Sequence, residues 1–181
     1  NGDMAEAEKY LKEKGLAAMA KRAERATTEG RLFIRQTGNK IAVVELTCET
    51  DFVANNADFI AVGEKLLDVT FEKGYTKVEA DHEAILEPLK VSIRENMKVA
   101  KVEVIDVPAD ASASFYVHSD KKTGAVVVVK GSTADAVKTF AYDCCLHIAA
   151  FTPAYISKKD VPDTYVAEQK EIFKAQMDQD E

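Results

Sequence analysis

The sequence predicts an α+β fold made of two related subdomains, each an antiparallel, hairpin-based sheet packed with helices, preceded by an N-terminal helical segment. Residues that favour helices dominate the start of the chain. Two later stretches, 32–46 and 116–130, each consist of an apolar run, a glycine-containing turn and a second apolar run, and each is followed by a loop and a helical pattern. We therefore expect a helical segment over residues 1–30, a first subdomain over 31–107 and a second over 108–181.

The composition indicates a soluble globular chain. It has 181 residues, of which 46% are hydrophobic, enough for one compact domain or two small ones. No apolar run approaches the length of a membrane span, and the charged first twenty residues do not resemble a signal peptide. The net charge of −7 argues against direct nucleic-acid binding. The three cysteines form no CxxC pair, so we expect reduced thiols and a cytoplasmic location.

The first half of the chain is predicted to contain a helix and a hairpin. Residues 4–28 favour helix, and Gly15 predicts either a kink or a division into two helices. Residues 31–36 and 40–46 are expected to form the two strands, joined by the Thr37-Gly38-Asn39 turn.

Two further helices are expected before the middle of the chain. Residues 56–73 form an amphipathic pattern that ends at Gly74, a plausible residue to follow a helix C-terminus. The apolar face of this pattern has a three-to-four residue spacing and consists of Phe59, Val62, Leu66, Leu67 and Thr70. Residues 77–97 are mostly helical, with a break expected before Pro88 because proline lacks the amide hydrogen.

The second half repeats this order. We expect a strand over residues 99–107, a connection over 109–114, a hairpin over 115–130 and a helix over 134–151. A last helix is expected to begin at Pro162. The buried side of the 134–151 helix is predicted to consist of Val137, Phe140, Ala141, Cys144 and Ile148.

A polar loop between the first hairpin and the 56–73 helix contains two apolar residues that belong to no periodic pattern. These are Phe52 and Val53, which follow Thr50 and Asp51. From the pattern alone, Phe52 is more often a buried plug, and Asp51 is more often a cap or turn residue. The opposite interpretation is a recognition loop held between a strand and a helix.

The stretch Thr47–Phe59, TCETDFVANNADF, resembles the signature segment of the elongation factor Ts family. Residues 5–30, 92–99 and 146–162 resemble other segments of that family in the same order. The resemblance implies a cytoplasmic guanine-nucleotide exchange factor that acts in translation elongation without covalent chemistry and without a cofactor. It would bind elongation factor Tu and promote GDP release by disturbing the Mg²⁺ and phosphate site of that GTPase.

The resemblance also implies which residues contact the partner. In the family, the Asp-Phe pair of the TDFV motif intrudes beside the Mg²⁺ site, which corresponds to Asp51 and Phe52 here. Two substitutions put the other contacts in doubt, since Arg94 and Ser119 stand where the family has glycine. Ile93 could equally be a core residue, and a histidine at a hairpin turn is commonly a plain surface residue. The implied partner-binding residues are Thr50, Asp51, Phe52, Val53, Ile93 and His118.

The family has a small helical domain before this region, and a helical coiled-coil excursion with a returning strand after it. The resemblance therefore implies that a homodimer contact, or a further partner contact, would use that C-terminal segment. A related hypothesis is that this chain is a binding core that docks on its partner but exchanges nucleotide poorly.

An enzyme or small-ligand domain is the rival hypothesis. It would use the Lys130–Thr133 loop to hold a phosphate or Cys145 and His147 as a reactive pair. Helix capping by Ser132 or Thr133, and burial of Cys145 as a small core residue, account for these residues more simply. Glu49 and Asp51 alone make a poor cation site, and no zinc or phosphate-loop motif is present in the sequence. We expect no catalytic residue and no metal ligand.

Overall fold

The computed structural model describes residues 4–178, and the chain divides into two compact units, Asn1–Ala149 and Ala150–Glu181. The predicted α+β class is confirmed, and the subdomain boundaries that the sequence suggested remain a prediction. In chain order the elements are α1 (Met4–Arg22), β1 (Glu29–Thr37), β2 (Lys40–Cys48), α2 (Asp51–Ala54), α3 (Ala57–Lys73), α4 (Ala80–Ile93), β3 (Lys98–Asp106), β4 (Ala111–Val117), β5 (Gly124–Lys130), α5 (Asp135–Phe151), the short 3₁₀ helix η1 (Lys158–Asp160) and α6 (Asp163–Met177).

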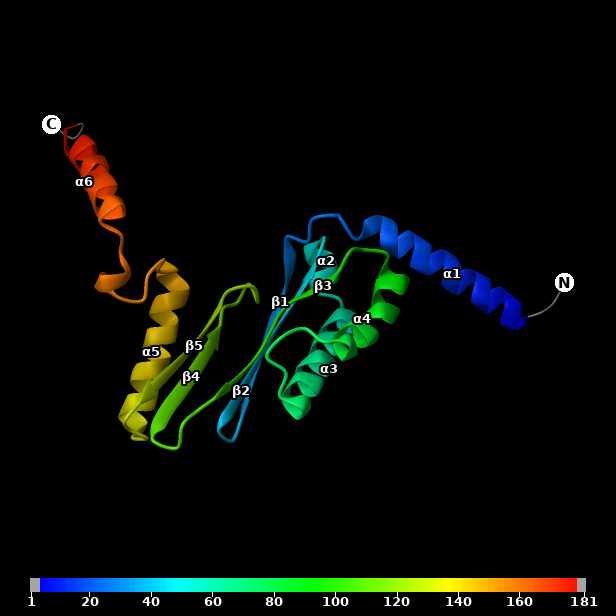
Figure 1. Ribbon diagram of the computed structural model, residues 1–181, viewed down its shortest axis with the longest axis horizontal. Coiled ribbons are helices and arrows are strands. Elements are labelled where there is room, and N and C mark those ends of the chain that lie inside the picture. The colour runs from blue at the N-terminus through cyan, green and yellow to red at the C-terminus, as the bar shows by residue number, and fades with distance from the viewer. Residues whose placement is uncertain (1–3, 179–181) are drawn as a thin grey trace. The chain divides into compact units, whose positions relative to one another are not determined.

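The first unit is built on an antiparallel sheet in the order β1-β2-β3 (Figure 1). Thr37 pairs with Lys40, so β1 and β2 are joined by the two-residue turn Gly38-Asn39, close to the predicted hairpin. The pairing of β2 with β3 shifts between Glu45 and Leu46, near the end of β2 that leads to the TDFV segment. Such a shift bends a strand and directs the chain that follows it.

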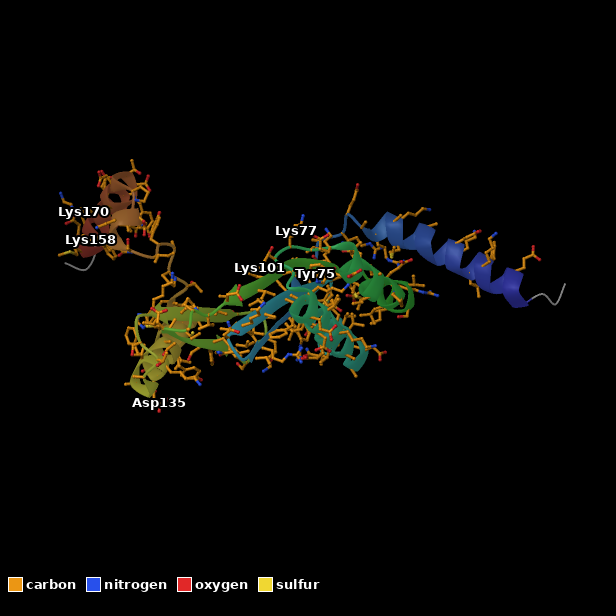
Figure 2. All side chains as sticks on the ribbon, turned by 60° about the horizontal axis from the view of Figure 1, so that its bottom comes forward. Tyr75, Lys77, Lys101, Asp135, Lys158 and Lys170 are labelled. Atoms are coloured by element: carbon orange, nitrogen blue, oxygen red, sulfur yellow. The ribbon has the colours of Figure 1, made fainter. Side chains whose placement is uncertain are left out.

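One face of this sheet is covered by α3 and α4, which enclose the main apolar core (Figure 1). Helix α3 begins and ends as the sequence predicts. The Asn56 side chain accepts a hydrogen bond from the Asp58 amide, and Gly74 is left-handed, with φ 66°. The fully enclosed side chains of this core include Phe59, Leu66, Leu67 and Leu86. Tyr75, labelled in Figure 2, lies in the connection between α3 and α4, and its hydroxyl donates to Asp81 at 2.7 Å.

The opposite face of the sheet packs against the β4–β5 hairpin through a smaller apolar cluster, which includes Ile41, Val43 and Ala113. The tip of this hairpin is anchored on β1, because the Leu32 amide donates to the Lys121 carbonyl at 2.7 Å. An ion pair of 3.0 Å joins Lys122 to Glu29 beside it.

The expected connection over residues 109–114 is wrong, because β4 already begins at Ala111. Its first residues are small and buried, so α5 can lie close to the strand. The hydroxyl of Ser112 donates to the Ser132 carbonyl at 2.9 Å, and that of Ser114 donates to the Lys138 carbonyl at 3.0 Å. Alternation of alanine and serine is therefore a strand signal here, since each serine hydroxyl has a backbone acceptor.

The predicted division of the first helix at Gly15 and the predicted helix break before Pro88 are also wrong. Helix α1 continues through Gly15, where a Cβ atom would lie 3.0 Å from the Val91 side chain, so this glycine lets α1 approach α4. Helix α4 continues through Pro88, which is exposed, while Leu86 and Leu89 beside it are buried in the core. Burial of these leucines offsets the single backbone hydrogen bond that proline removes.

Helix α5 buries a narrower face than predicted. Ala141 and Cys145 are fully enclosed, whereas Phe140 is 58% exposed, so its expected place in the buried stripe is wrong. The apolar face is rotated slightly about the helix axis from the predicted one, so Cys145 rather than Cys144 faces the strands.

In the second unit, Pro162 precedes α6 at the N-cap position, and the rings of Tyr155 and Tyr165 meet edge to face with centroids 5.4 Å apart. Within the described residues 4–178, none of the helices combines the length and the apolar character needed to cross a bilayer.

Candidate functional site

The TDFV segment forms the single helical turn α2 rather than the expected loop. Thr50 is its N-cap residue, with an extended backbone and a side-chain oxygen that accepts from the Val53 amide at 3.4 Å. At the other end, the Asn55 amide and side-chain nitrogen both donate to the Asp51 carbonyl, at 3.0 and 2.8 Å. Both ends of this turn are therefore closed by hydrogen bonds.

The side chains of α2 divide into an inward and an outward pair. Val53 packs against the main core and Ala54 is buried, whereas Asp51 and Phe52 are exposed. Successive helical residues point about 100° apart, so fixing Val53 and Ala54 inward directs the two preceding side chains outward. The ring of Phe52 is 84% exposed. The interpretation of Phe52 as a buried plug, which the pattern alone favours, is therefore wrong.

Exposure alone does not mark Phe52 as a recognition residue, because other large apolar side chains of the described chain are also exposed, such as Ile156 and Phe173. What distinguishes Phe52 is its backbone support. Its own amide donates to the Asp51 carboxylate at 3.0 Å, which orients this carboxylate beside the ring. The arrangement presents an apolar ring and an adjacent negative charge on one rigid turn.

The segment that follows α4 holds the base of this turn. The Glu95 carboxylate accepts from the amides of Glu49 and Thr50, both at 3.1 Å, and from the Thr50 hydroxyl at 2.7 Å. In the opposite direction, the Glu49 carboxylate accepts from the Asn96 amide at 2.6 Å. Sequence analysis missed Glu95 and Asn96. The only available signal was their proximity in the sequence to Ile93, since pairing across more than forty residues has no local pattern.

The Asn96 side chain extends this support to the start of the sheet. Its amide nitrogen donates to the carbonyls of Ala23 and Arg25, at 3.1 and 2.6 Å, and Arg25 forms a 3.5 Å ion pair with Glu49. Arg31 of β1 donates to the Asn55 side chain at 3.1 Å on the far side of α2. The turn is thus held from several elements at once.

The other predicted contact residues lie on different elements. Ile93, the last residue of α4, is half-buried and packs against the main core, as the core interpretation expected. His118 is exposed at the β4–β5 turn, where its Nδ1 lies 2.9 Å from the Tyr116 hydroxyl. The ring of Tyr116 also meets Tyr142 of α5, with centroids 6.2 Å apart. Among the described residues, the hydrogen bonds and ring contact of His118 are with residues outside α2.

The rival site lacks a reactive thiol. Cys145 is fully enclosed and its thiol donates to the Ser114 carbonyl at 3.4 Å. Burial raises the pKa of this thiol, which keeps it protonated, and His147 is exposed on another side of α5. The Ser132 hydroxyl accepts from the Ala134 amide at 3.3 Å, so it supports the start of α5. Among the described residues, no group of three potential ligands is placed to hold a metal ion.

Comparison of the sequence with known proteins points to one family. The family model described as "Elongation factor TS" matches residues 49–181, beginning at the residue before Thr50. Three relatives are each called elongation factor Ts. The protein from Treponema denticola is 50% identical over 98% of this chain, that from Treponema pallidum is 43% identical over 96%, and that from Borrelia recurrentis is 37% identical over 98%. The chain spans 65% of the first relative's length and 66% of the other two.

Proposed function

This chain belongs to the elongation factor Ts family, and on that premise we propose that it is a guanine-nucleotide exchange factor, which binds elongation factor Tu and promotes GDP release during translation elongation. The observation that supports this most is the ring of Phe52, which is 84% exposed. It lies on the hydrogen-bonded turn α2, inside the stretch that matches the family. The chain acts by binding and carries out no covalent chemistry.

The proposed exchange is a matter of linked binding equilibria. A factor that binds the nucleotide-free GTPase more tightly than the GDP complex must weaken GDP binding by the same ratio. The GTPase holds GDP through Mg²⁺ and backbone amides around the phosphates, so the factor has to disturb those contacts. It needs a group that keeps its own shape while it displaces the partner's residues.

In this proposal Phe52 inserts into an apolar gap of the partner, and Asp51 acts at the nearby Mg²⁺ and phosphate site by charge and hydrogen bonding. Thr50 and Val53 serve the interface by holding the turn, one as its cap and the other as its anchor in the core. A turn whose backbone is already held by hydrogen bonds loses little conformational entropy on binding, so more of the interaction energy remains available to displace Mg²⁺.

Two further contacts belong to the proposal. His118 contacts the partner from the β4–β5 turn, where the neighbouring Tyr116 hydroxyl holds its ring. Ile93 contributes its exposed edge beside the Glu95 segment. A homodimer remains a prediction, which sedimentation of a longer chain would test.

The test is GDP release from elongation factor Tu, followed with a fluorescent GDP analogue by stopped flow. We expect the wild-type chain to accelerate release, and Phe52→Ala to lower the acceleration at least about tenfold, as truncation of a central aromatic anchor does. The matched control is Phe173→Ala, which removes a ring that is also exposed but lies in α6. Circular dichroism should show that both variants are folded.

Two results would contradict the proposal. If the wild-type chain does not accelerate release, the exchange function is wrong for this chain. If it accelerates release and Phe52→Ala does so equally well, the exchange function stands but the role of Phe52 is wrong. A chain that binds nucleotide-free elongation factor Tu tightly without accelerating release would be the docking core described by the related hypothesis.

A further inference from the structure

We propose that Glu95 is a positioning residue for exchange, which sets the direction of Phe52 through the Thr50 cap without contacting the partner. This inference rests on the proposed function and names a residue outside the TDFV motif. Glu95 lies more than forty positions along the chain from α2, yet its carboxylate accepts three hydrogen bonds from the two residues that precede α2.

The three bonds use both oxygens of the carboxylate. Oε2 accepts from the Glu49 and Thr50 amides, and Oε1 accepts from the Thr50 hydroxyl at 2.7 Å. Because the hydroxyl gives its proton to Glu95, its lone pairs face the Val53 amide and close the cap of α2. Glu95 thereby determines how the Thr50 hydroxyl is oriented, and the hydroxyl determines where α2 begins.

The position of Glu95 is itself fixed by its neighbours. Arg94 has a left-handed backbone, with φ 65°, which turns the chain away from the axis of α4. Asn96, on the other side, donates to Glu49 and to the segment after α1. The two segments therefore exchange amide-to-carboxylate bonds in both directions, which resists sliding and rotation of the base of α2.

A carboxylate is required at this place. All three partners are donors, and an ionised carboxylate presents only acceptors. Glu95→Gln would leave one acceptor oxygen and would direct an NH₂ group at a donor. Bonds to a charged group are stronger than neutral ones, and loss of such a bond corresponds to a change of about tenfold to hundredfold in an equilibrium. We therefore expect a large effect from either Glu95→Ala or Glu95→Gln.

The experiment is a double-mutant cycle in stopped-flow GDP release from elongation factor Tu, with the full chain as wild type, Glu95→Ala, Phe52→Ala and the double variant. We expect Glu95→Ala to lower exchange about tenfold in the wild-type background and less than about twofold in the Phe52→Ala background. That pattern means that Glu95 acts through Phe52. The control is Glu83→Ala, which removes a carboxylate of α4 whose ion pair is with Lys90, away from α2.

A second readout needs no partner. Amide hydrogen exchange of the free chain should become faster at Val53 and Ala54 in Glu95→Ala, with the α3 amides unchanged, because only the cap is released. A uniform acceleration over α3 would indicate a general loss of stability and would overturn the inference. If Glu95→Ala does not fold, Thr50→Val tests the same link, since it removes the hydroxyl and keeps the shape.

The outcomes separate this inference from the proposed function. If Phe52→Ala impairs exchange and Glu95→Ala does not, Glu95 has no positioning role while the function stands. Equal losses from Glu95→Ala in both backgrounds would also overturn the inference, because Glu95 would then act independently of Phe52. If the wild-type chain fails to accelerate release, the proposed function and the role of Glu95 in exchange are both wrong, and amide hydrogen exchange of the free chain then decides whether Glu95 holds the cap of α2.

Discussion

Arg94 adopts a backbone conformation that residues other than glycine rarely take, with φ 65° and ψ 24° at the end of α4. A left-handed residue with a Cβ atom is strained by about 1–2 kcal/mol. The strain is tolerated because the turn brings Glu95 and Asn96 to the base of α2. The family has glycine at the position that matches Arg94. This chain keeps the left-handed turn without the residue best suited to it.

Arg94→Gly should therefore raise the free energy of unfolding by about 0.5–1 kcal/mol, the relief of strain less the extra chain entropy of glycine. Urea denaturation followed by circular dichroism measures this change. Arg94→Ala is the matched control, because it removes the charge and keeps the strain, and it should be close to neutral. If Arg94→Gly lowers the free energy of unfolding instead, the contacts of the arginine side chain stabilise the fold by more than the left-handed backbone destabilises it.

Cys48 is a thiol that the fold keeps protonated. Burial, followed by the negative charge of Glu95, raises its pKa to about 11 from 9.0. The folded state therefore retains a proton that the unfolded state loses above pH 9. The contribution of this thiol to stability is fully present below pH 9 and is lost as the pH rises through 11.

Thiol labelling at pH 8 tests this account of the cysteines. The half-buried Cys144 should react first in the folded chain, whereas Cys48 and Cys145 should react only after denaturant is added. Mass spectrometry of the labelled peptides identifies each site. Rapid labelling of Cys145 in the folded chain would instead favour the rival hypothesis of a reactive cysteine.

At the scale of secondary-structure elements, α3 and the sheet meet at a glycine. A Cβ atom at Gly63 would lie 2.0 Å from the Phe33 ring, which is buried under the helix. Helix α3 therefore lies closer to β1 than any side chain at this position allows.

Gly63→Ala should lower the free energy of unfolding by about 1–3 kcal/mol, because the ring or the helix must move. Thermal and urea unfolding measure the loss. Ala61→Gly, at an exposed site of the same helix, is the control and should lower stability by only about 1 kcal/mol through helix propensity. An unchanged stability of Gly63→Ala would show that the Phe33 ring has room to rotate away.

Much of the secondary structure was predictable from the sequence. The first hairpin and both ends of α3 follow from local signals, namely a glycine turn, an asparagine cap and a left-handed glycine. The predictions that failed involve partners distant in the sequence. Pro88 stays helical because Leu86 and Leu89 are buried in the core. Residues 111–114 form a strand because they pair with β5, and their serine hydroxyls find backbone acceptors near α5.

In the candidate site, too, the local features were predictable and the contacts between distant segments were not. The motif itself is visible in the sequence, and the resemblance directs attention to Asp51 and Phe52. Pattern reasoning alone favoured burial of Phe52, because it cannot see that Val53 and Ala54 take the inward positions. The bonds of Glu95 to Glu49 and Thr50 were not predictable, since they connect segments that only the fold brings together.

For the whole chain to act as proposed, the first unit must present α2 in a fixed position and keep it there when the partner binds. The main core lies under α2, and the β4–β5 hairpin packs on the other face of the sheet. If the proposed function holds, this support lets α2 displace groups of the partner without being displaced itself. The Phe52 ring should then change environment on binding while the rest of the first unit does not.

The most direct measurement uses the fact that the chain contains no tryptophan. Phe52→Trp places a single indole at the tip of α2, and acrylamide quenching then reports its exposure to water. If Phe52 is the inserted group, quenching is efficient in the free chain. On addition of nucleotide-free elongation factor Tu, the indole becomes strongly protected and its emission shifts to shorter wavelength, after subtraction of the partner's own signal. An indole already protected in the free chain, or one equally quenched with and without the partner, would contradict the account.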